Sequence, residues 1–127
     1  LKVNRLEAEA LTGIAVQAPA DALRAAQSLH TQGVSRVLVS LGAAGVGWCD
    51  ADGSTGFLAA RPVPVVNTTG AGDALLAGVV AGLQRHMPLP QAVVHGRACA
   101  EITLSSTFAN SSELSYAAVV RHNLSLL

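Results

Sequence analysis

A chain of 127 residues with 50% hydrophobic side chains and a mean hydropathy of +0.43 has enough apolar surface for one globular domain, which excludes a disordered protein. The formal net charge is zero, so the chain lacks the basic excess that nucleic-acid binding requires. No apolar run reaches the roughly 18 residues of a membrane span, and the first residues do not resemble a signal peptide, so we expect a cytoplasmic protein without nucleic-acid or membrane partners.

The first third of the chain predicts two helices. Residues 4–11 carry apolar side chains at helical spacing, and Gly13 follows as a stop signal. Residues 20–32 have one apolar face and an acid in the first turn, and Gly33 follows as a C-terminal cap. The spaced apolar residues of the first helix are Leu6, Ala10 and Leu11.

A strand and a hairpin are predicted next. Residues 35–41 form a β-branched run without polar alternation, which is typical of a strand covered on both faces. Residues 46–49 and 55–59 flank an Asp-Gly turn at 50–53 and predict an antiparallel hairpin. Two prolines mark residues 62–66 as an edge segment.

The second half predicts three helices. Residues 71–85 are small or apolar except for one acid, one glutamine and the arginine that ends the segment, so we expect a helix that is buried nearly all round. Further helices are predicted at 90–103 and 113–122, with the polar loop 105–112 between them. This order of elements predicts a layered α/β fold, in which helices cover the faces of a sheet.

The sequence NTTGAGD, residues 67–73, precedes the first of these three helices. Gly70, Ala71 and Gly72 offer successive backbone N–H groups with little side-chain bulk, at the helix end that carries partial positive charge. Asp73 could serve only as a first-turn acid, which the helix dipole favours. A capping acid does not need two glycines before it, whereas phosphoryl transfer needs bare N–H donors beside a carboxylate base. The pattern therefore favours a phosphoryl-transfer site.

Three segments resemble the ribokinase-like, or PfkB, family of sugar and nucleoside kinases. NTTGAGD is similar to the family signature D-T-x-G-A-G-D, with Asn67 in place of the first aspartate. LKVNRLEAEALTG resembles the N-x-x-E segment and supplies Asn4 and Glu7, and VLVSLGAAGVGW resembles the strand-turn segment with paired glycines. The resemblance implies that the chain is the C-terminal part of a three-layer α/β/α fold.

Within the family, the sequence is most similar to the bacterial pseudouridine kinases. The similarity lies in NRLEAEALTG, in Asn67 and in the tail SSTFANSSELS. It implies an ATP-dependent kinase that phosphorylates pseudouridine at its 5′-hydroxyl group. A sugar kinase of the ribokinase or fructokinase type, and a nucleotide-binding module without catalysis, are the alternatives.

The resemblance implies a role for each matched residue. Asp73 is expected to be the base that deprotonates the acceptor hydroxyl, while residues 70–72 bind the γ-phosphate of ATP. Glu7 and Asn4 are expected to organise Mg²⁺ through water, because Mg²⁺ keeps much of its hydration shell. Family members often hold a monovalent cation such as K⁺ beside the anion hole, where this chain has Asn67, a neutral carbonyl donor.

The other matched residues are expected to contact ATP. They are Ser40, Gly42 and Gly45 on the phosphate and ribose side, Thr69 in the signature, and Asn110 in a loop that closes over the adenine.

Several of these residues also have a structural interpretation. Asn4 and Glu7 have the spacing of an N-cap and its capping-box acid. Gly42 and Gly45 can shape a tight turn between strands, and an asparagine in a polar loop is ordinarily solvated. The residues alone leave both interpretations open.

The cysteines and histidines form no shared motif. Cys49 and Cys99 are expected to be small buried residues rather than a disulfide or part of a zinc site. His95 and Cys99 are spaced so that they could ligate a metal, but a buried helix face is the favoured interpretation. Trp48 and Phe57 are expected to pack within the hairpin.

The chain begins at Leu1, on what resembles the end of a strand. The resemblance implies that residues 1–127 are the C-terminal ATP-binding and catalytic portion of a longer kinase, without the N-terminal acceptor-binding half and its lid. The isolated chain is expected to be inactive, because phosphoryl transfer depends on a positioned acceptor, and its open sheet edge favours self-association. The acceptor and the oligomeric state stay open, with a homodimer of the full-length protein as one possibility.

Overall fold

The computed structural model of the protein describes residues 1–66, 68, 70–105 and 116–125. The chain forms two compact units, unit 1 (Leu1–Arg61) and unit 2 (Pro62–Leu127). Unit 1 contains a mixed β-sheet with helices, whereas the described residues of unit 2 form helices and connecting segments. The predicted α/β class is confirmed.

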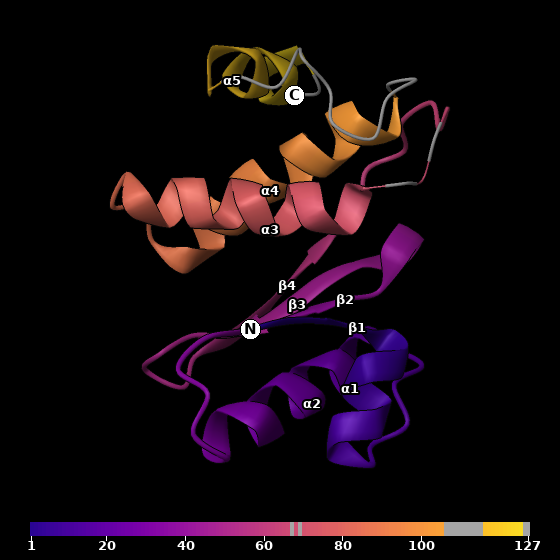
Figure 1. Ribbon diagram of the computed structural model, residues 1–127, viewed down its shortest axis with the longest axis vertical. Helices are drawn as coiled ribbons and strands as arrows, with labels where there is room; N and C mark the ends of the chain where they lie inside the picture. The colour runs from indigo at the N-terminus through magenta and orange to yellow at the C-terminus, as the bar shows by residue number, and fades with distance from the viewer. Residues whose placement is uncertain (67, 69, 106–115, 126–127) are drawn as a thin grey trace. The chain divides into compact units, whose positions relative to one another are not determined.

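Unit 1 begins with a strand and two helices and continues into three further strands. Its elements are β1 (Lys2–Asn4), α1 (Arg5–Thr12), α2 (Pro19–Thr31), β2 (Val37–Ser40), the short 3₁₀ turn η1 (Gly42–Ala44), β3 (Gly45–Cys49) and β4 (Thr55–Ala59). The strand order is β1-β2-β3-β4, with β1 parallel to β2 and the other two pairs antiparallel. Helices α1 and α2 lie on one face of this sheet (Figure 1). The predicted helices, strand and hairpin are confirmed.

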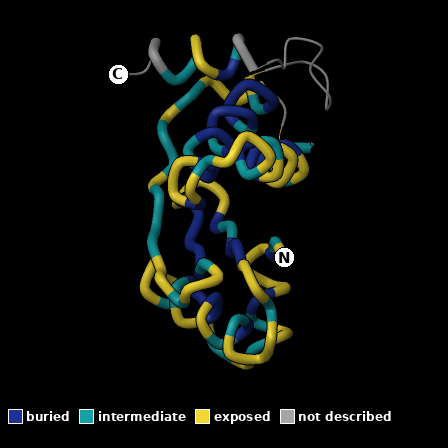
Figure 2. Tube along the Cα trace, turned by 90° about the vertical axis from the view of Figure 1, so that its left-hand side faces the viewer, coloured by how far each residue is buried: buried dark blue, intermediate teal, exposed yellow. Residues whose placement is uncertain are grey.

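The core of unit 1 lies between α2 and the inner strands of the sheet. All of β3 and most of β2 are buried, and Figure 2 shows this contrast with the largely exposed loops. Trp48 is buried and Phe57 packs against the core, as expected for both. The apolar face of α2 fills the space beneath the strands with mostly small side chains. These are Ala22, Ala25, Ala26 and Leu29.

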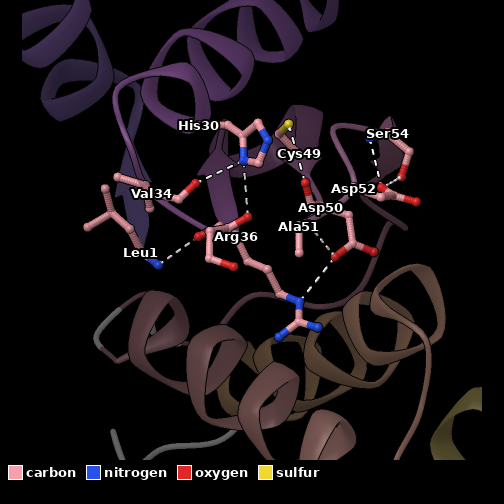
Figure 3. A network of polar contacts seen from close by, with 10 residues as sticks. Leu1, His30, Val34, Arg36, Cys49, Asp50, Ala51, Asp52 and Ser54 are labelled. Atoms are coloured by element: carbon pink, nitrogen blue, oxygen red, sulfur yellow. Dashed lines mark hydrogen bonds and ion pairs between the residues drawn. The ribbon is translucent and has the colours of Figure 1, made fainter.

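Polar contacts fix the turn between β3 and β4 (Figure 3). Asp50 Oδ1 accepts a hydrogen bond from the Ala51 N–H at 2.7 Å and lies 3.1 Å from Arg36 Nε. Asp52 Oδ1 accepts hydrogen bonds from the hydroxyl and the backbone N–H of Ser54, and these bonds lower the pKa of the Asp52 carboxyl. The Asp-Gly signal therefore marks a turn that aspartate side chains also stabilise.

The apolar residues that predicted α1 do not form its buried face. Leu6 is 74% exposed and Leu11 is 55% exposed, whereas Ala8 is buried against the core of unit 1. The spacing therefore predicted the helix correctly but did not identify the side that packs on the sheet.

Unit 2 contains three helices in its described residues. They are α3 (Ala71–Gln84), α4 (Leu89–Leu104) and α5 (Tyr116–Ser125). The first two agree with the prediction, and α5 ends three residues beyond the predicted 113–122, while residues 113–115 lie outside the described part of the chain. The expectation that α3 is buried nearly all round is wrong, because Leu76 and Val80 are 38% and 45% exposed.

Residues 62–66 are not a strand, contrary to the predicted edge segment. Pro62 and Pro64 have no backbone N–H to donate to a neighbouring strand, and Val65 and Val66 are exposed. The Val66 N–H instead donates to the Leu104 carbonyl at 2.7 Å. This bond ties the segment before residues 67–73, called the glycine–acid loop below, to the last turn of α4.

Helices α3 and α4 approach each other through glycines. A Cβ atom built on Gly78 would lie 2.7 Å from the Gly96 Cα atom and 2.8 Å from the Cys99 Sγ atom. Both distances are shorter than van der Waals contact, so the two helix axes can keep this separation only if residue 78 has no side chain.

Among the described residues, no helix combines the length and the apolar composition that a membrane crossing requires.

We predict that Gly78→Ala destabilises the protein by about 1–3 kcal/mol, because the added methyl group has to displace the backbone of α4. Chemical denaturation measures the free energy of unfolding. At an open helical position the same substitution would be stabilising by up to about 1 kcal/mol. A loss of stability would therefore show that α4 crowds residue 78, and a gain would show that it does not. Val80→Ala, on the exposed side of the same helix, is the control and should change stability by less than about 0.5 kcal/mol.

A second prediction concerns the start of α2. Asp21 Oδ2 accepts hydrogen bonds from the backbone N–H groups of Gln17 at 3.0 Å and Ala18 at 2.9 Å. These bonds, together with the contact to Arg24, lower the pKa of the Asp21 carboxyl. The charged carboxylate therefore stabilises the fold above the pKa of the unfolded carboxyl, about 3.9, and the contribution is lost as the pH falls through the lower folded pKa.

Asp21→Asn should accordingly lower the free energy of unfolding at pH 7, and the difference from the wild type should disappear toward pH 2. Urea denaturation at a series of pH values measures it. A difference that stays constant with pH would show that the charge of Asp21 does not stabilise the start of α2.

Candidate functional site

The first turn of α3 carries little side-chain bulk around its backbone N–H groups. Gly70 is the N-cap of α3 and has a φ of 84°, a left-handed backbone conformation that favours glycine. The Ala74 N–H donates to the Gly70 carbonyl at 2.9 Å, which closes the first turn of the helix. By helix geometry, the N–H groups of residues 71–73 have no acceptor within α3. The N-cap residue Gly70 has no side chain that could accept hydrogen bonds from them. They are donors at the positive end of the helix.

Asp73 occupies the third position of α3 and is exposed, whereas the following Ala74 and Leu75 are buried. Its carboxylate is therefore accessible from solvent. The structure thus combines helix N–H donors and an accessible carboxylate within one turn of helix, as the sequence predicted. Asn67 and Thr69 of the same loop lie outside the described residues.

A second group of predicted residues lies at one edge of the sheet in unit 1. Asn4 and Ser40 are register partners where the parallel strands β1 and β2 end. Glu7 follows in the first turn of α1, and Gly42 begins the turn after β2. The carboxyl ends of parallel strands are where open α/β sheets bind ligands. The structure therefore brings four of the predicted residues to a position that suits a ligand.

The contacts of Asn4 and Glu7 confirm the capping interpretation. Asn4 Oδ1 accepts a hydrogen bond from the Glu7 N–H at 2.8 Å, and Glu7 Oε1 accepts one from the Asn4 N–H at 2.9 Å. This reciprocal pair starts α1. Both residues are exposed, and the Asn4 N–H bond uses only one of the two carboxylate oxygens of Glu7.

The contacts of the three predicted residues after β1 show which of them a ligand could reach. These residues are Ser40, Gly42 and Gly45. The Ser40 hydroxyl donates to the Val3 carbonyl at 3.4 Å and so links β2 to β1. A Cβ atom on Gly45 would lie 2.2 Å from the Leu58 carbonyl oxygen, so the approach of β4 explains this glycine. A Cβ atom on Gly42 would have nothing within 4 Å, and its bare backbone is open to a ligand. Asn110 lies outside the described residues.

The cysteines and His95 are buried, as expected for packing residues. Burial raises the pKa of the Cys99 thiol. Burial also raises the pKa of the Cys49 thiol, and the nearby negative charges of Asp50 and Asp52 add a smaller increase. Burial and then the charge of Arg85 lower the pKa of His95. Among the described residues, no group of three histidine, cysteine, aspartate or glutamate side chains is placed to hold a metal ion.

Glu101 of α4 is a buried acid that no sequence motif singles out. This carboxylate is 3% exposed, and its Oε1 atom lies 3.2 Å from Nε2 of His122 in α5. A buried carboxylate is costly unless it is paired, so the contact with His122 is an important structural feature. Its only sequence signal is that Glu101 is the single acidic residue of α4.

Comparison with known proteins identifies the family. The chain belongs to the pfkB family of carbohydrate kinases, whose profile matches residues 1–115. It is 38% identical over 120 residues to the pseudouridine kinase of Escherichia coli (strain K12), a match that covers 94% of this chain. Its fold is similar to that of Arabidopsis thaliana ribokinase complexed with ribose and ATP, with a TM-score of 0.87, 25% identity and 97% of this chain covered.

The phosphofructokinase-2 of Escherichia coli in complex with potassium is similar as well, with a TM-score of 0.83, 26% identity and 98% of this chain covered. The chain spans 38% of the length of the pseudouridine kinase and 40% of each of the two crystallised chains. The α/β fold predicted from the sequence is thus the fold of ribokinase-like structures, over part of their length.

We predict that Asn4→Ala lowers the stability of the protein by about 1 kcal/mol, because the Glu7 N–H loses its acceptor at the start of α1. Asn4→Ser should keep most of the stability, since serine also caps helices well. Thermal and chemical denaturation measure the effect. Arg5→Ala, at the next and exposed position, is the control, and a loss equal to that of Asn4→Ala would contradict the capping role.

Proposed function

We propose that the protein is an ATP-dependent phosphotransferase that acts on a sugar or nucleoside hydroxyl, and that its acceptor is pseudouridine, which it converts to pseudouridine 5′-phosphate. The observation that carries the activity is the first turn of α3, where a left-handed glycine, bare helix N–H groups and an exposed carboxylate follow one another. The acceptor is supported by the 38% identity to a pseudouridine kinase.

In this proposal Asp73 is the general base. Its carboxylate accepts the proton of the acceptor 5′-hydroxyl as that oxygen attacks the γ-phosphorus of ATP, and the bond to ADP breaks. The N–H groups of Gly70, Ala71 and Gly72 donate to the γ-phosphate oxygens and stabilise the charge on them. The exposure of Asp73 and the open first turn of α3 support these roles.

The residues at the sheet edge of unit 1 fit a hydrated magnesium ion. Mg²⁺ in kinases is held by one or two carboxylates, by water and by substrate phosphates, and it neutralises phosphate charge. Glu7 is exposed and its bond to Asn4 uses one carboxylate oxygen, so a second oxygen remains for a metal-bound water. We therefore assign Glu7 as the metal-organising residue, with Asn4 orienting it through the capping pair.

The nucleotide contacts are proposed on the same basis. Gly42 offers open backbone to the ATP phosphates, and Ser40 lies beside it at the end of β2. Gly45 acts mainly through the turn that it permits between η1 and β3. Thr69 is proposed to contact ATP, and Asn67 to lie at a potassium site, from the family signature alone. Asn110 is proposed to contact ATP from the resemblance of its loop to the family.

The chain is much shorter than the pseudouridine kinase that it resembles, and this limits what it can do by itself. It spans 38% of a pseudouridine kinase, and we propose that it corresponds to the C-terminal ATP-binding and catalytic portion of such an enzyme. Acceptor binding would then depend on residues outside these 127, and the isolated chain should not turn over ATP with pseudouridine.

A sugar kinase is the second candidate function. The similarity to a ribokinase complexed with ribose and ATP, at a TM-score of 0.87, favours it. A panel of pseudouridine, uridine, ribose and fructose, tested with the full-length protein and ATP, separates the two candidates. Product from pseudouridine alone supports the proposal, and product from ribose or fructose alone overturns the acceptor assignment.

We predict that Asp73→Asn in the full-length protein lowers kcat by about 10²–10⁴-fold, because the amide cannot accept the hydroxyl proton. The KM for ATP should stay within about twofold, since phosphate binding rests on backbone N–H groups. A coupled ADP-release assay measures both values.

Asp52→Asn is the matched control, because it removes an exposed aspartate from the hairpin turn. It should leave kcat unchanged. Full activity of Asp73→Asn would rule out the base assignment.

A further inference from the structure

Helix α5 shares a core with the beginning of α3. Val119 of α5 is 2% exposed and belongs to the same apolar cluster as Ala74 of α3. The other members of this cluster come from α4, and they are Ala98, Cys99 and Ile102. Ala74 directly follows Asp73, and its N–H bond to Gly70 closes the first turn of α3. The packing of α5 therefore bears on the turn that presents the candidate base.

A polar contact holds α5 in register with α4. His122 Nε2 lies 3.2 Å from Glu101 Oε1, and the side chains are 20% and 4% exposed, respectively. The imidazole N–H donates and the carboxylate accepts. Val119 and His122 are three residues apart, so they lie on the same side of α5. One side of α5 thus makes both the apolar contact and the polar contact.

The burial of Glu101 makes this contact sensitive to position. A carboxylate that is 3% exposed loses most of its hydration, and the nearby His122 nitrogen compensates for part of that loss. An apolar contact tolerates sliding by an ångström, whereas a hydrogen bond weakens when its distance or angle changes. The pair therefore fixes α5 along and around its axis better than the apolar cluster alone.

We propose that Glu101 and His122 are positioning residues for phosphoryl transfer: their contact fixes α5, and α5 in turn holds the first turn of α3 in the geometry that Asp73 requires. The proposal rests on the function proposed above for Asp73. It adds two residues that touch neither ATP nor the acceptor and act only through the apolar cluster around Ala74.

The experiment compares three single variants, and the double variant of Glu101 and His122, with the wild-type full-length enzyme. His122→Ala removes the donor, Glu101→Gln keeps the shape but removes the charge, and Val120→Ala changes an exposed neighbour on α5 as the control. The readouts are kcat, the two KM values, and hydrogen exchange of the backbone amides of residues 74–77, with the amides of α2 in unit 1 as the internal reference.

For His122→Ala we expect kcat to fall roughly tenfold while the KM for the acceptor stays within about twofold, because a displaced base impairs transfer rather than binding. Exchange at residues 74–77 should become about tenfold faster, without change in α2. The loss of kcat should be smaller in Glu101→Gln, since the amide oxygen still accepts a hydrogen bond from the imidazole. Adding Glu101→Gln to His122→Ala should cost little more than His122→Ala alone, because both act through one contact.

Three outcomes would overturn the proposal. They are an unchanged kcat and exchange rate in His122→Ala together with a lower melting temperature, an equal loss in Val120→Ala, and independent, additive losses in the double variant. If His122→Ala does not fold, His122→Phe decides, because it keeps the ring but has no N–H to donate to Glu101. Normal exchange and kcat in that variant would show that the pair has no positioning role. A wild-type enzyme without kinase activity would refute the proposed function instead, while the exchange at residues 74–77 would still report on the contact.

Discussion

Gly78 of α3 and Gly96 of α4 bring two helix backbones so close that a methyl group on either residue would meet the opposite helix. This contact sets where α3 lies in unit 2, and the remaining features of the candidate site follow from that position. The Val66 bond to the end of α4 brings the chain into the loop, Gly70 turns it, and Asp73 emerges on the exposed side of the first turn. The candidate site at the start of α3 thus depends on a contact between small residues one to two turns further along the helix.

The starts of the first three helices show how differently one physical problem can be solved. Every helix begins with N–H groups that lack partners within the helix. Asn4 and Glu7 satisfy them reciprocally in α1, and the Asp21 carboxylate binds the N–H groups that lead into α2. Helix α3 begins at a glycine, which has no side chain to serve as an acceptor. The proposed phosphate site at the start of α3 rests on this difference more than on the presence of an acid.

The identity of the family and the identity of the acceptor rest on different parts of the argument. The glycine–acid loop and the sheet edge at Asn4 and Ser40 are features of the chain itself and agree with membership in the pfkB family. The acceptor is inferred from likeness to a pseudouridine kinase of which this chain spans 38%. Phosphoryl transfer gains much of its rate from positioning, so under the proposed function the residues that orient the acceptor would decide which hydroxyl group Asp73 deprotonates.

Much of the local structure of this protein is determined by its sequence alone. The Asp-Gly turn, the capping pair of Asn4 and Glu7, and the glycines before Asp73 act through neighbours in the chain, so the hairpin, α1 and the start of α3 were all predictable. Contacts between residues far apart in the sequence were not. The exposure of Leu6 and Val80, the glycine contact of α3 with α4, and the pairing of Glu101 with His122 depend on which surfaces meet. Only the tertiary structure decides that, because a periodic pattern shows that a helix has an apolar face but not which neighbour covers it.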